Sequence, residues 1–425
     1  MRTRRLFGLL IGLTLAVSAC AGPAVTPVAP TATLAIASVT PAPATSVPTQ
    51  AATAVPPTVS PTEAPPTQTA APVATTEPTI EPTLAPVPAV GATLHNPSHL
   101  AFDAAGNLYV SQCAQQQPQL LKIDTQGMLT IFASTHQGYG GDGGPAVTAG
   151  IGCATGLAFD QAGNLYVSDL LNGSIRRIGG NGVITTVVGG GSGTDGGPAL
   201  GASIAYPMDV VFDAGGNMYI LDSGNRQIRK VDTQGIISTV AGDGSTGFSG
   251  DGGPAIAAEF DFTWGDPPSA PAMAIGPDGN LYIADSSNGR VRKIDQKGII
   301  TTIAGKDGPK VSGDGGPATQ AVLGRPTGLA FDAAGNLFIA TADSDSILNS
   351  SIRRVDARGI ITTVAGTGKD GFGGDGGPAT AAELYYPWGM AFDQAGNLYV
   401  ADAGNARVRR IDSKGIIQTV AGGPS

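Results

Sequence analysis

The chain has 425 residues, of which 63 are Gly and 32 are Pro, so these two residue types make up 22% of it. It carries 33 acidic and 24 basic residues, and the resulting net charge of −9 argues against a general nucleic-acid-binding protein. Three Cys residues without CxxC or Cys/His spacing exclude a disulfide-rich scaffold and a structural zinc site. A hydrophobic content of 41% nevertheless indicates that part of the chain builds a core.

The first twenty residues have the pattern of an export signal. Arginines at positions 2, 4 and 5 precede an apolar run over 6–19, which is too short for a membrane-spanning helix of about 20 residues. The sequence Val-Ser-Ala-Cys at 17–20 resembles the lipobox of bacterial lipoproteins. This resemblance implies removal of residues 1–19, acylation of Cys20 (palmitate, for example) and an extracytoplasmic protein anchored to the bacterial cell membrane. The alternative is a plain cleavage site with an incidental Cys.

Residues 20–90 are predicted to be a disordered tether. Half of the 32 prolines lie within 21–90, where the only charged residues are Glu63, Glu77 and Glu81. Frequent Pro removes backbone donors and fixes φ, so the segment should stay extended and build no core. At about 3.1 Å per residue it would span on the order of 200 Å.

From 91 to 425 the sequence repeats one unit six times. Words such as FDAAGNLYV and FDQAGNLYV place Gly-Asn pairs at 106, 163, 216, 279, 335 and 396. This spacing of 53 to 63 residues, with four short β-rich runs per unit, predicts an all-β fold, a six-bladed β-propeller of four-stranded antiparallel blades. In blade 5, strands A to D are expected at 328–331, 337–340, 352–355 and 360–365. Closure is expected from packing of blade 1 on blade 6, helped by residues 85–95.

One unit, PWGMAFDQAGNLYVADAGNARVRRID at 387–412, resembles the NHL repeat. The long connections that carry DGGPA, at 142, 195, 251, 314 and 375, are similar to those of bacterial secreted NHL proteins and of the teneurin NHL propeller. The resemblance covers about 335 residues. It implies a binding or sensing domain, because NHL propellers elsewhere act mostly in that way, but it does not imply a ligand.

Positions at which the repeats differ are the candidate sites. All length differences fall in the B–C loops and D–A connections, which share one face of a propeller, and such variation is typical of a binding face. Unusual aromatics occur there, of which Trp264, Trp388 and Tyr386 are candidate ligand contacts, while Tyr206 and Tyr385 are expected to fill gaps between blades. The alternative is neutral drift of surface loops.

Just before strand A, where four blades have Gly or Ala, blades 1 and 3 have His99 and Asp209. These side chains are expected near the mouth of the central channel, where they could bind a ligand or do acid–base work. Related six-bladed folds include metal-dependent lactonases and lyases, so an axial-site enzyme is the alternative function. The other interpretation is a solvated His and Asp without a joint role. No metal or cofactor is expected.

Two further patterns make structural predictions. Cys113 and Cys153 fall in loops of adjacent blades on the same face, outside a reducing compartment, and are predicted to form a disulfide. Strand C repeats an arginine, at 176, 229, 292, 353 and 409. Its periodicity favours ion pairs with the blade's own Asp residues over a basic ring that binds polyanions.

The sequence as a whole therefore predicts a membrane-tethered binding propeller without chemistry of its own. Its partner would be an extracytoplasmic protein, peptide or glycan. A passive structural module at the cell surface is a third possibility.

Overall fold

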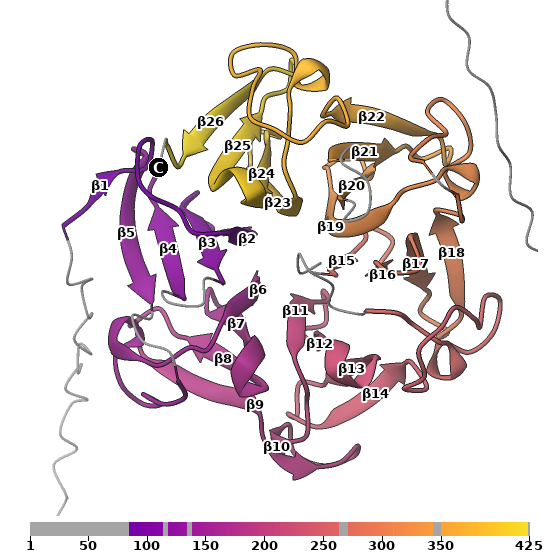
Figure 1. Cartoon of the computed structure of the whole chain (residues 1–425). Coiled ribbons are helices and arrows are strands. Elements are labelled where there is room, and N and C mark those ends of the chain that lie inside the picture. Colours follow the sequence, from indigo (N-terminus) through magenta and orange to yellow (C-terminus); the bar gives the residue numbers. More distant parts are fainter. Residues whose placement is uncertain are drawn as a thin grey trace, which may run out of the picture. The chain divides into compact units, whose positions relative to one another are not determined.

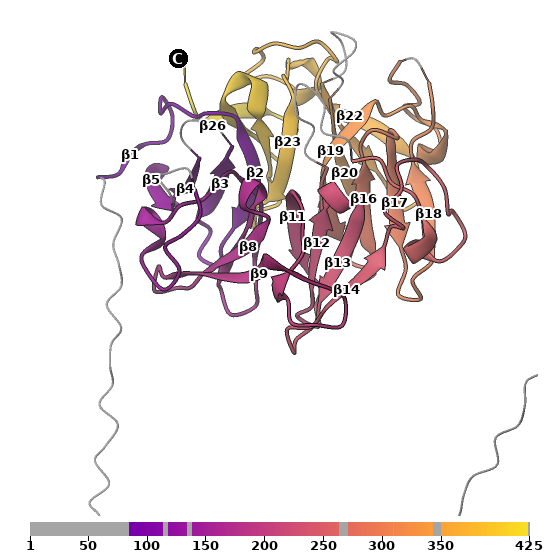
Figure 2. The ribbon, with the colours of Figure 1, turned by 60° about the horizontal axis from the view of Figure 1, so that its bottom comes forward.

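The computed structural model describes residues 85–113, 118–133, 138–262, 271–308, 310–342 and 350–423. Within these residues the strands form six sheets, arranged around a central axis as the blades of a propeller (Figure 1). Figure 2 shows the blades standing side by side in a closed ring. The predicted six-bladed architecture is confirmed.

The four main strands of each blade form a meander in which consecutive strands pair antiparallel, whereas the additional strand β10 pairs parallel with β9. The first strands line the axis: β2 (Pro97–Phe102), β6 (Ala154–Phe159), β11 (Pro207–Phe212), β15 (Met273–Ile275), β19 (Arg325–Phe331) and β23 (Pro387–Phe392). The second strands are β3 (Leu108–Gln112), β7 (Leu165–Asp169), β12 (Met218–Asp222), β16 (Leu281–Asp285), β20 (Leu337–Ala342) and β24 (Leu398–Asp402).

The third strands are β4 (Gln119–Ile123), β8 (Ser174–Ile178), β13 (Gln227–Val231), β17 (Arg290–Ile294), β21 (Ser351–Val355) and β25 (Arg407–Ile411). The outer strands are β5 (Met128–Ala133), β9 (Ile184–Gly193), β14 (Ile237–Ala241), β18 (Ile300–Ala304), β22 (Ile361–Ala365) and β26 (Ile417–Ala421). Blades 1 and 2 each have a fifth strand, β1 (Val87–Pro88) and β10 (Leu200–Ala202).

The A–B turns are held by their own acidic residue. In blade 1, Asp103 accepts hydrogen bonds from the backbone amides of Ala105 and Asn107 at 3.0 and 2.8 Å. Gly106 has a φ of +85°, a conformation that residues with a Cβ rarely adopt. The repeated D-x-x-G-N word is therefore a turn with a fixed shape, and it sets the register of strands A and B.

The connections between blades lie against the outer strand of the next blade. In the connection to blade 2, Asp142 accepts from the Thr186 amide in β9, and Pro145 pairs with Val183 just before that strand. A short 3₁₀ turn follows DGGP in four connections: η1 (Ala146–Thr148), η4 (Ala255–Ala257), η5 (Ala318–Gln320) and η6 (Ala379–Ala381). Three B–C loops also contain one: η2 (Leu170–Asn172), η3 (Ser223–Asn225) and η7 (Ala403–Asn405).

The seam between blades 1 and 6 is closed by backbone hydrogen bonds as well as by packing. β1 pairs antiparallel with β5 in blade 1. Just beyond it, the Gly91 amide donates to the carbonyl of Gly422, and the Gly422 amide donates to the carbonyl of Ala89. The sheet therefore begins at Val87, before the expected boundary at residue 91, and the N-terminal segment joins the first blade to the last.

Candidate functional site

Side-chain hydroxyls connect neighbouring blades at the axis. Thr155 in β6 donates to the carbonyl of Pro207 in blade 3, and Thr327 in β19 donates to that of Pro387 in blade 6. Ser111 in β3 accepts from the amide of His99 at 2.9 Å and donates to the carbonyl of Thr155 at 2.7 Å. These bonds fix the starts of the first strands, where the side chains that differ between blades are found.

His99 and Asp209 come together at the axis, although their own blades are separated by blade 2. His99 Nε2 lies 3.7 Å from Asp209 Oδ1, and both side chains are more than nine-tenths buried. Gly156 of blade 2 lies between them and leaves room for Asp209, because a Cβ atom at Gly156 would lie 2.5 Å from the Asp209 Cα atom. The pair is therefore buried, and the interpretation of the two residues as a solvated His and Asp is wrong.

The two members of this axial pair are satisfied to different degrees. Asp209 Oδ2 accepts from the amide of Met273 in blade 4 at 2.7 Å, and Oδ1 accepts from the Val210 amide at 2.8 Å. Among the residues that the structure describes, neither ring nitrogen of His99 has a hydrogen-bond partner. Asp209 thus holds blade 3 to blade 4, whereas the imidazole has unused hydrogen-bonding capacity.

Burial sets the protonation of the axial pair. Removal from water raises the pKa of Asp209 to about 7, against the two amides that favour its charged form. The same desolvation lowers the pKa of His99 to about 4. The imidazole is therefore neutral near pH 7, and the contact is not an imidazolium–carboxylate ion pair despite its short distance.

The axial pair does not fit a metal-dependent catalytic centre. No group of three or more His, Cys, Asp or Glu side chains within reach of one metal ion occurs in the described part of the chain. Both carboxylate oxygens of Asp209 already accept hydrogen bonds from backbone amides. The imidazole of His99 is therefore the one available ligand that the pair offers. A metal would lack the further protein ligands that stable sites require.

The strand C arginines are buried inside the blades. Arg176 donates to Asp169 at 3.3 Å and to Asp142 at 2.7 Å, and to the carbonyls of Gly140 and Gly150. Arg229, Arg292 and Arg409 have the same two acidic partners in their blades. In blade 5, Thr341 replaces the strand B acid, and Arg353 pairs with Asp314. The predicted ion pairs with the blade's own Asp are confirmed in blades 2, 3, 4 and 6 but not in blade 5, and the Asp of DGGPA is a partner that the sequence did not indicate.

The aromatic residues expected on the B–C and D–A face differ in where the structure places them. Trp388, expected on a loop, lies in β23 against Ala403 and is only 7% exposed. Its backbone lies so close to Gly328 in blade 5 that a Cβ atom there would overlap the Trp388 carbonyl oxygen. Trp264 lies outside the described residues. Tyr386 is half-buried, with its ring centroid 4.7 Å from that of Tyr385.

Several aromatics that the sequence did not favour are exposed on this face. Tyr206 and Tyr385, expected to fill gaps, are 51% and 36% exposed. Phe248 and Phe372 occupy equivalent places in the connections to blades 4 and 6 and are 40% and 45% exposed. Their rings stack on Arg290 at 4.0 Å and on Arg407 at 3.8 Å. The word G-F-x-G before DGGPA, present in both connections, was the signal available in the sequence.

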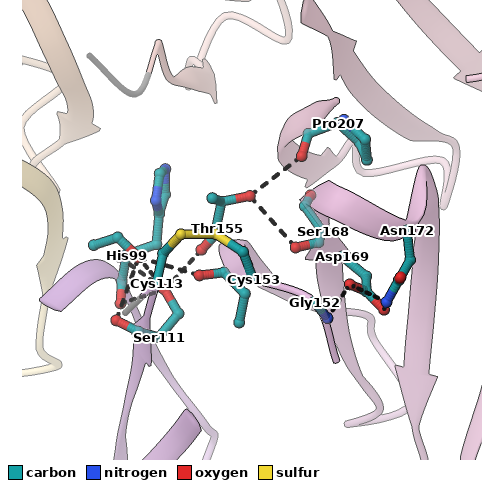
Figure 3. Close-up of a disulfide and its surroundings, with 12 residues drawn as sticks. His99, Ser111, Cys113, Gly152, Cys153, Thr155, Ser168, Asp169, Asn172 and Pro207 are labelled. Atoms are coloured by element: carbon teal, nitrogen blue, oxygen red, sulfur yellow. Dashed lines mark hydrogen bonds between the residues drawn. A yellow bond between two sulfur atoms is a disulfide. The ribbon is translucent and has the colours of Figure 1, made fainter. Parts of the chain in front are cut away.

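A disulfide joins blades 1 and 2 beside the axial pair (Figure 3). Cys113 follows β3 and Cys153 precedes β6, and their Cα atoms lie 4.7 Å apart across 40 residues of sequence. The bond therefore links the end of β3, which pairs with the strand that carries His99, to the start of β6, which carries Thr155. Figure 3 shows the His99 ring extending away from the hydrogen-bonded groups around Ser111.

Comparisons with known proteins identify the repeat. Residues 368–425 match the family model described as the teneurin NHL domain. The chain is 32% identical to Teneurin-1 of Mus musculus over 235 residues, which is 51% of this chain and 8% of that protein. It is 28% identical to Protein SUPPRESSOR OF QUENCHING 1, chloroplastic, of Arabidopsis thaliana over 74% of this chain and 30% of that protein. The chain thus spans less than a third of the length of these relatives.

A solved structure supports the same fold. An auxiliary nutrient binding protein from Bacteroides thetaiotaomicron superimposes with a TM-score of 0.53 at 15% identity, covering 77% of this chain and 70% of that one. No helix among the described residues is long and apolar enough to cross a membrane. The repeat pattern, the six blades and the match to the family model together show that the chain contains an NHL-repeat six-bladed β-propeller.

Proposed function

We propose that this protein is a non-catalytic binding propeller that captures an extracytoplasmic protein, peptide or glycan on its B–C and D–A face. The observation that carries the proposal is the set of exposed aromatics on that face. Phe372 is held by Arg407 in a cation–π contact, and Tyr385 packs over Gly404 in the adjacent B–C loop. Rings that are exposed and yet fixed in place lose little conformational entropy when a partner covers them.

The location follows from the N-terminal sequence. The basic and apolar segment that ends at Cys20, followed by the Pro- and Thr-rich stretch, supports an exported lipoprotein with a spacer before the propeller. The relatives support a binding role to the extent that one structural neighbour is described as a nutrient binding protein. A partner outside the cytoplasm also agrees with the net negative charge, which disfavours nucleic acid.

The test measures capture of envelope glycans, peptides and proteins by the full-length protein, with single substitutions on the proposed face. Phe372→Ala and Tyr385→Ala should each weaken binding of the captured partner at least about tenfold, as hot-spot aromatics do. Ile236→Ala is the matched control, because this apolar side chain is 36% exposed at a C–D turn on the opposite face. Equal binding by all three variants would rule out this face as the binding site.

The alternative function is an axial-site lactonase or lyase that uses His99 and Asp209. Its support is the imidazole, which has no hydrogen-bond partner in the described part of the chain and lies 3.7 Å from a carboxylate. A lactonase or lyase activity that disappears in the His99→Ala/Asp209→Ala double variant would establish the enzyme. Capture that persists in this double variant, but is lost in Phe372→Ala, would establish the binding propeller.

A further inference from the structure

A belt of aromatic pairs runs around the propeller between adjacent blades. In each pair, an aromatic residue of a second strand meets the Phe of the next blade's first strand edge-on. Ring centroids lie 4.8–5.1 Å apart in Tyr109–Phe159, Tyr166–Phe212, Tyr282–Phe331, Phe338–Phe392 and Tyr399–Phe102. Such edge-to-face contacts stabilise by about 0.5–1.5 kcal/mol beyond the area that they bury.

The belt is interrupted between blades 3 and 4. Blade 4 reads IGPDG where other blades read FDxxG, so Ile275 occupies the place of the Phe. Among the described residues, Tyr219 of β12 therefore has no aromatic partner. A cleft of about 420 Å³ opens at this junction, lined by Tyr219, Ile275, Val240 and Leu281. Its volume lies within the usual range for small-molecule pockets.

The corresponding cleft between blades 1 and 2, of about 380 Å³, opens for a different reason. There the Tyr109 ring already contacts both Phe132 and Phe159. The opening lies beside a C–D turn rich in glycine, with Gly179, Gly180 and Gly182 in its lining. The aromatic surface is thus occupied at the first junction, whereas that of Tyr219 faces the cleft.

Polar groups at the cleft between blades 3 and 4 determine which substituents a bound aromatic ligand could carry. The Lys230 ammonium lies 5.7 Å from the Tyr219 ring centroid, and no described carboxylate lies within 4 Å of it. Asp213 is engaged by Asn217 and by the Tyr219 hydroxyl. Asp295 uses Oδ1 for the amides of Lys297 and Ile299, which leaves Oδ2 as an acceptor.

We propose that the junction of blades 3 and 4 is a binding site for a small phenol or indole. The ligand's ring lies in the cleft beside Ile275 and packs edge-on against Tyr219, as the Phe ring packs against its aromatic partner at the other junctions. Lys230 donates to a phenolic oxygen, and Asp295 accepts from the hydroxyl or the indole N–H. Because two carboxylates and one ammonium line the cleft, a neutral ring is favoured over an anionic one. The site lies among A–B and C–D turns, on the face opposite to the one proposed for partner capture.

The test titrates full-length protein with p-cresol and indole and measures binding by calorimetry and by chemical shifts assigned to Tyr219. The wild type should bind at one site, and Ile275→Phe should weaken binding at least tenfold because it restores the missing ring. Ile275→Val, which keeps the cleft, should bind as the wild type does. Absence of binding of both probes to the wild type at millimolar concentration would overturn the proposal, as would unchanged binding by Ile275→Phe.

Two further variants keep the test decisive if Ile275→Phe does not fold. Tyr219→Leu should weaken binding by roughly 2- to 12-fold, which corresponds to one aromatic pair. Phe331→Ile copies the blade 4 sequence into blade 5, beside Tyr282, and should create a second site, so that the stoichiometry rises from one to two. Binding that is indifferent to both substitutions would show that the vacant ring position is not the site.

Discussion

The strand C arginines and the axial pair are both buried and able to carry charge, yet they differ in how far their polar groups are satisfied. Arg409 pairs with Asp402 at 3.3 Å and with Asp375 at 2.7 Å, and it also donates to the carbonyls of Glu383 and Gly373. The imidazole of His99 is nearly as deeply buried, and neither of its nitrogens has a hydrogen-bond partner among the described residues, whereas Arg409 lacks one only at Nε. The repeated charge is part of the packing of five blades, while the imidazole that occurs once keeps unused hydrogen-bonding capacity.

This difference separates structural from candidate functional residues. The arginine that recurs in five blades has acidic partners that recur as well, so the cost of burying its charge is compensated. A group found once has no such partners, and its unused hydrogen-bonding capacity is where a ligand or a protonation change can act.

Removing one strand C arginine should destabilise the fold severely. Arg409→Leu leaves the fully buried Asp402 without its cation, so the free energy of unfolding should fall by about 3–5 kcal/mol in urea titrations. Adding Asp402→Gln copies blade 1, which has Gln112 and Leu121 at these places, and should recover most of the loss. Arg358→Ala, whose side chain is 82% exposed, is the control and should cost under about 1 kcal/mol. If Arg358→Ala and Arg409→Leu lowered the free energy of unfolding by similar amounts, the strand C arginines would not have the structural role described here.

Opening the disulfide should cost somewhat less. The Cys113→Ala/Cys153→Ala double variant frees a 40-residue span in the unfolded chain, which the loop-entropy model values at roughly 3–4 kcal/mol. Urea titrations of the variant and of the oxidised wild type measure the difference. Two free thiols besides Cys20 in the unreduced exported protein would contradict the pairing.

The axial pair should show opposing pH effects that one substitution separates. The raised pKa of Asp209 gives stability that is complete below about pH 4 and is lost as the pH rises toward 7. The lowered pKa of His99 gives stability that is present above about pH 6.5 and is lost as the pH falls toward 4. In Asp209→Asn only the second effect remains, so the variant should gain up to about 1.4 kcal/mol per pH unit over the wild type between pH 4 and 7.

The control for this measurement is Asp213→Asn, because hydrogen bonds from Asn217 and Tyr219 lower the pKa of that more exposed carboxyl against its partial desolvation. Its stability difference from the wild type should therefore change with pH in the opposite direction. Denaturant midpoints measured in steps of half a pH unit provide both curves. If the Asp209→Asn difference does not change with pH, the carboxyl titrates normally, and the axial pair is not electrostatically strained.

The repeat determined how much could be predicted from the sequence. Words such as FDQAGNLYV specify the A–B turn, the register of the two strands and the alternation of buried and partly exposed residues. The number of blades and the positions of the strands were therefore predictable, as β20 and β21 of blade 5 illustrate. Side-chain exposure in the connections was not, because it depends on contacts between blades. The backbone of Trp388 closely approaches Gly328 of the neighbouring blade, and this contact leaves no local pattern in the sequence. Phe372 stacks on Arg407 at the surface, and the word G-F-x-G marks its position without showing that the ring is exposed.

The hydrogen bonds around Gly422 have a consequence for how the protein can be divided. The segment 87–91 acts as a latch between the two ends of the ring, because it pairs with β5 of the first blade and with Gly422 after the last strand. A fragment that begins at residue 91 would keep all six blades but lose this latch. Tension applied at the N-terminal side would also reach these bonds first, so the seam between blades 1 and 6 is where the ring would open.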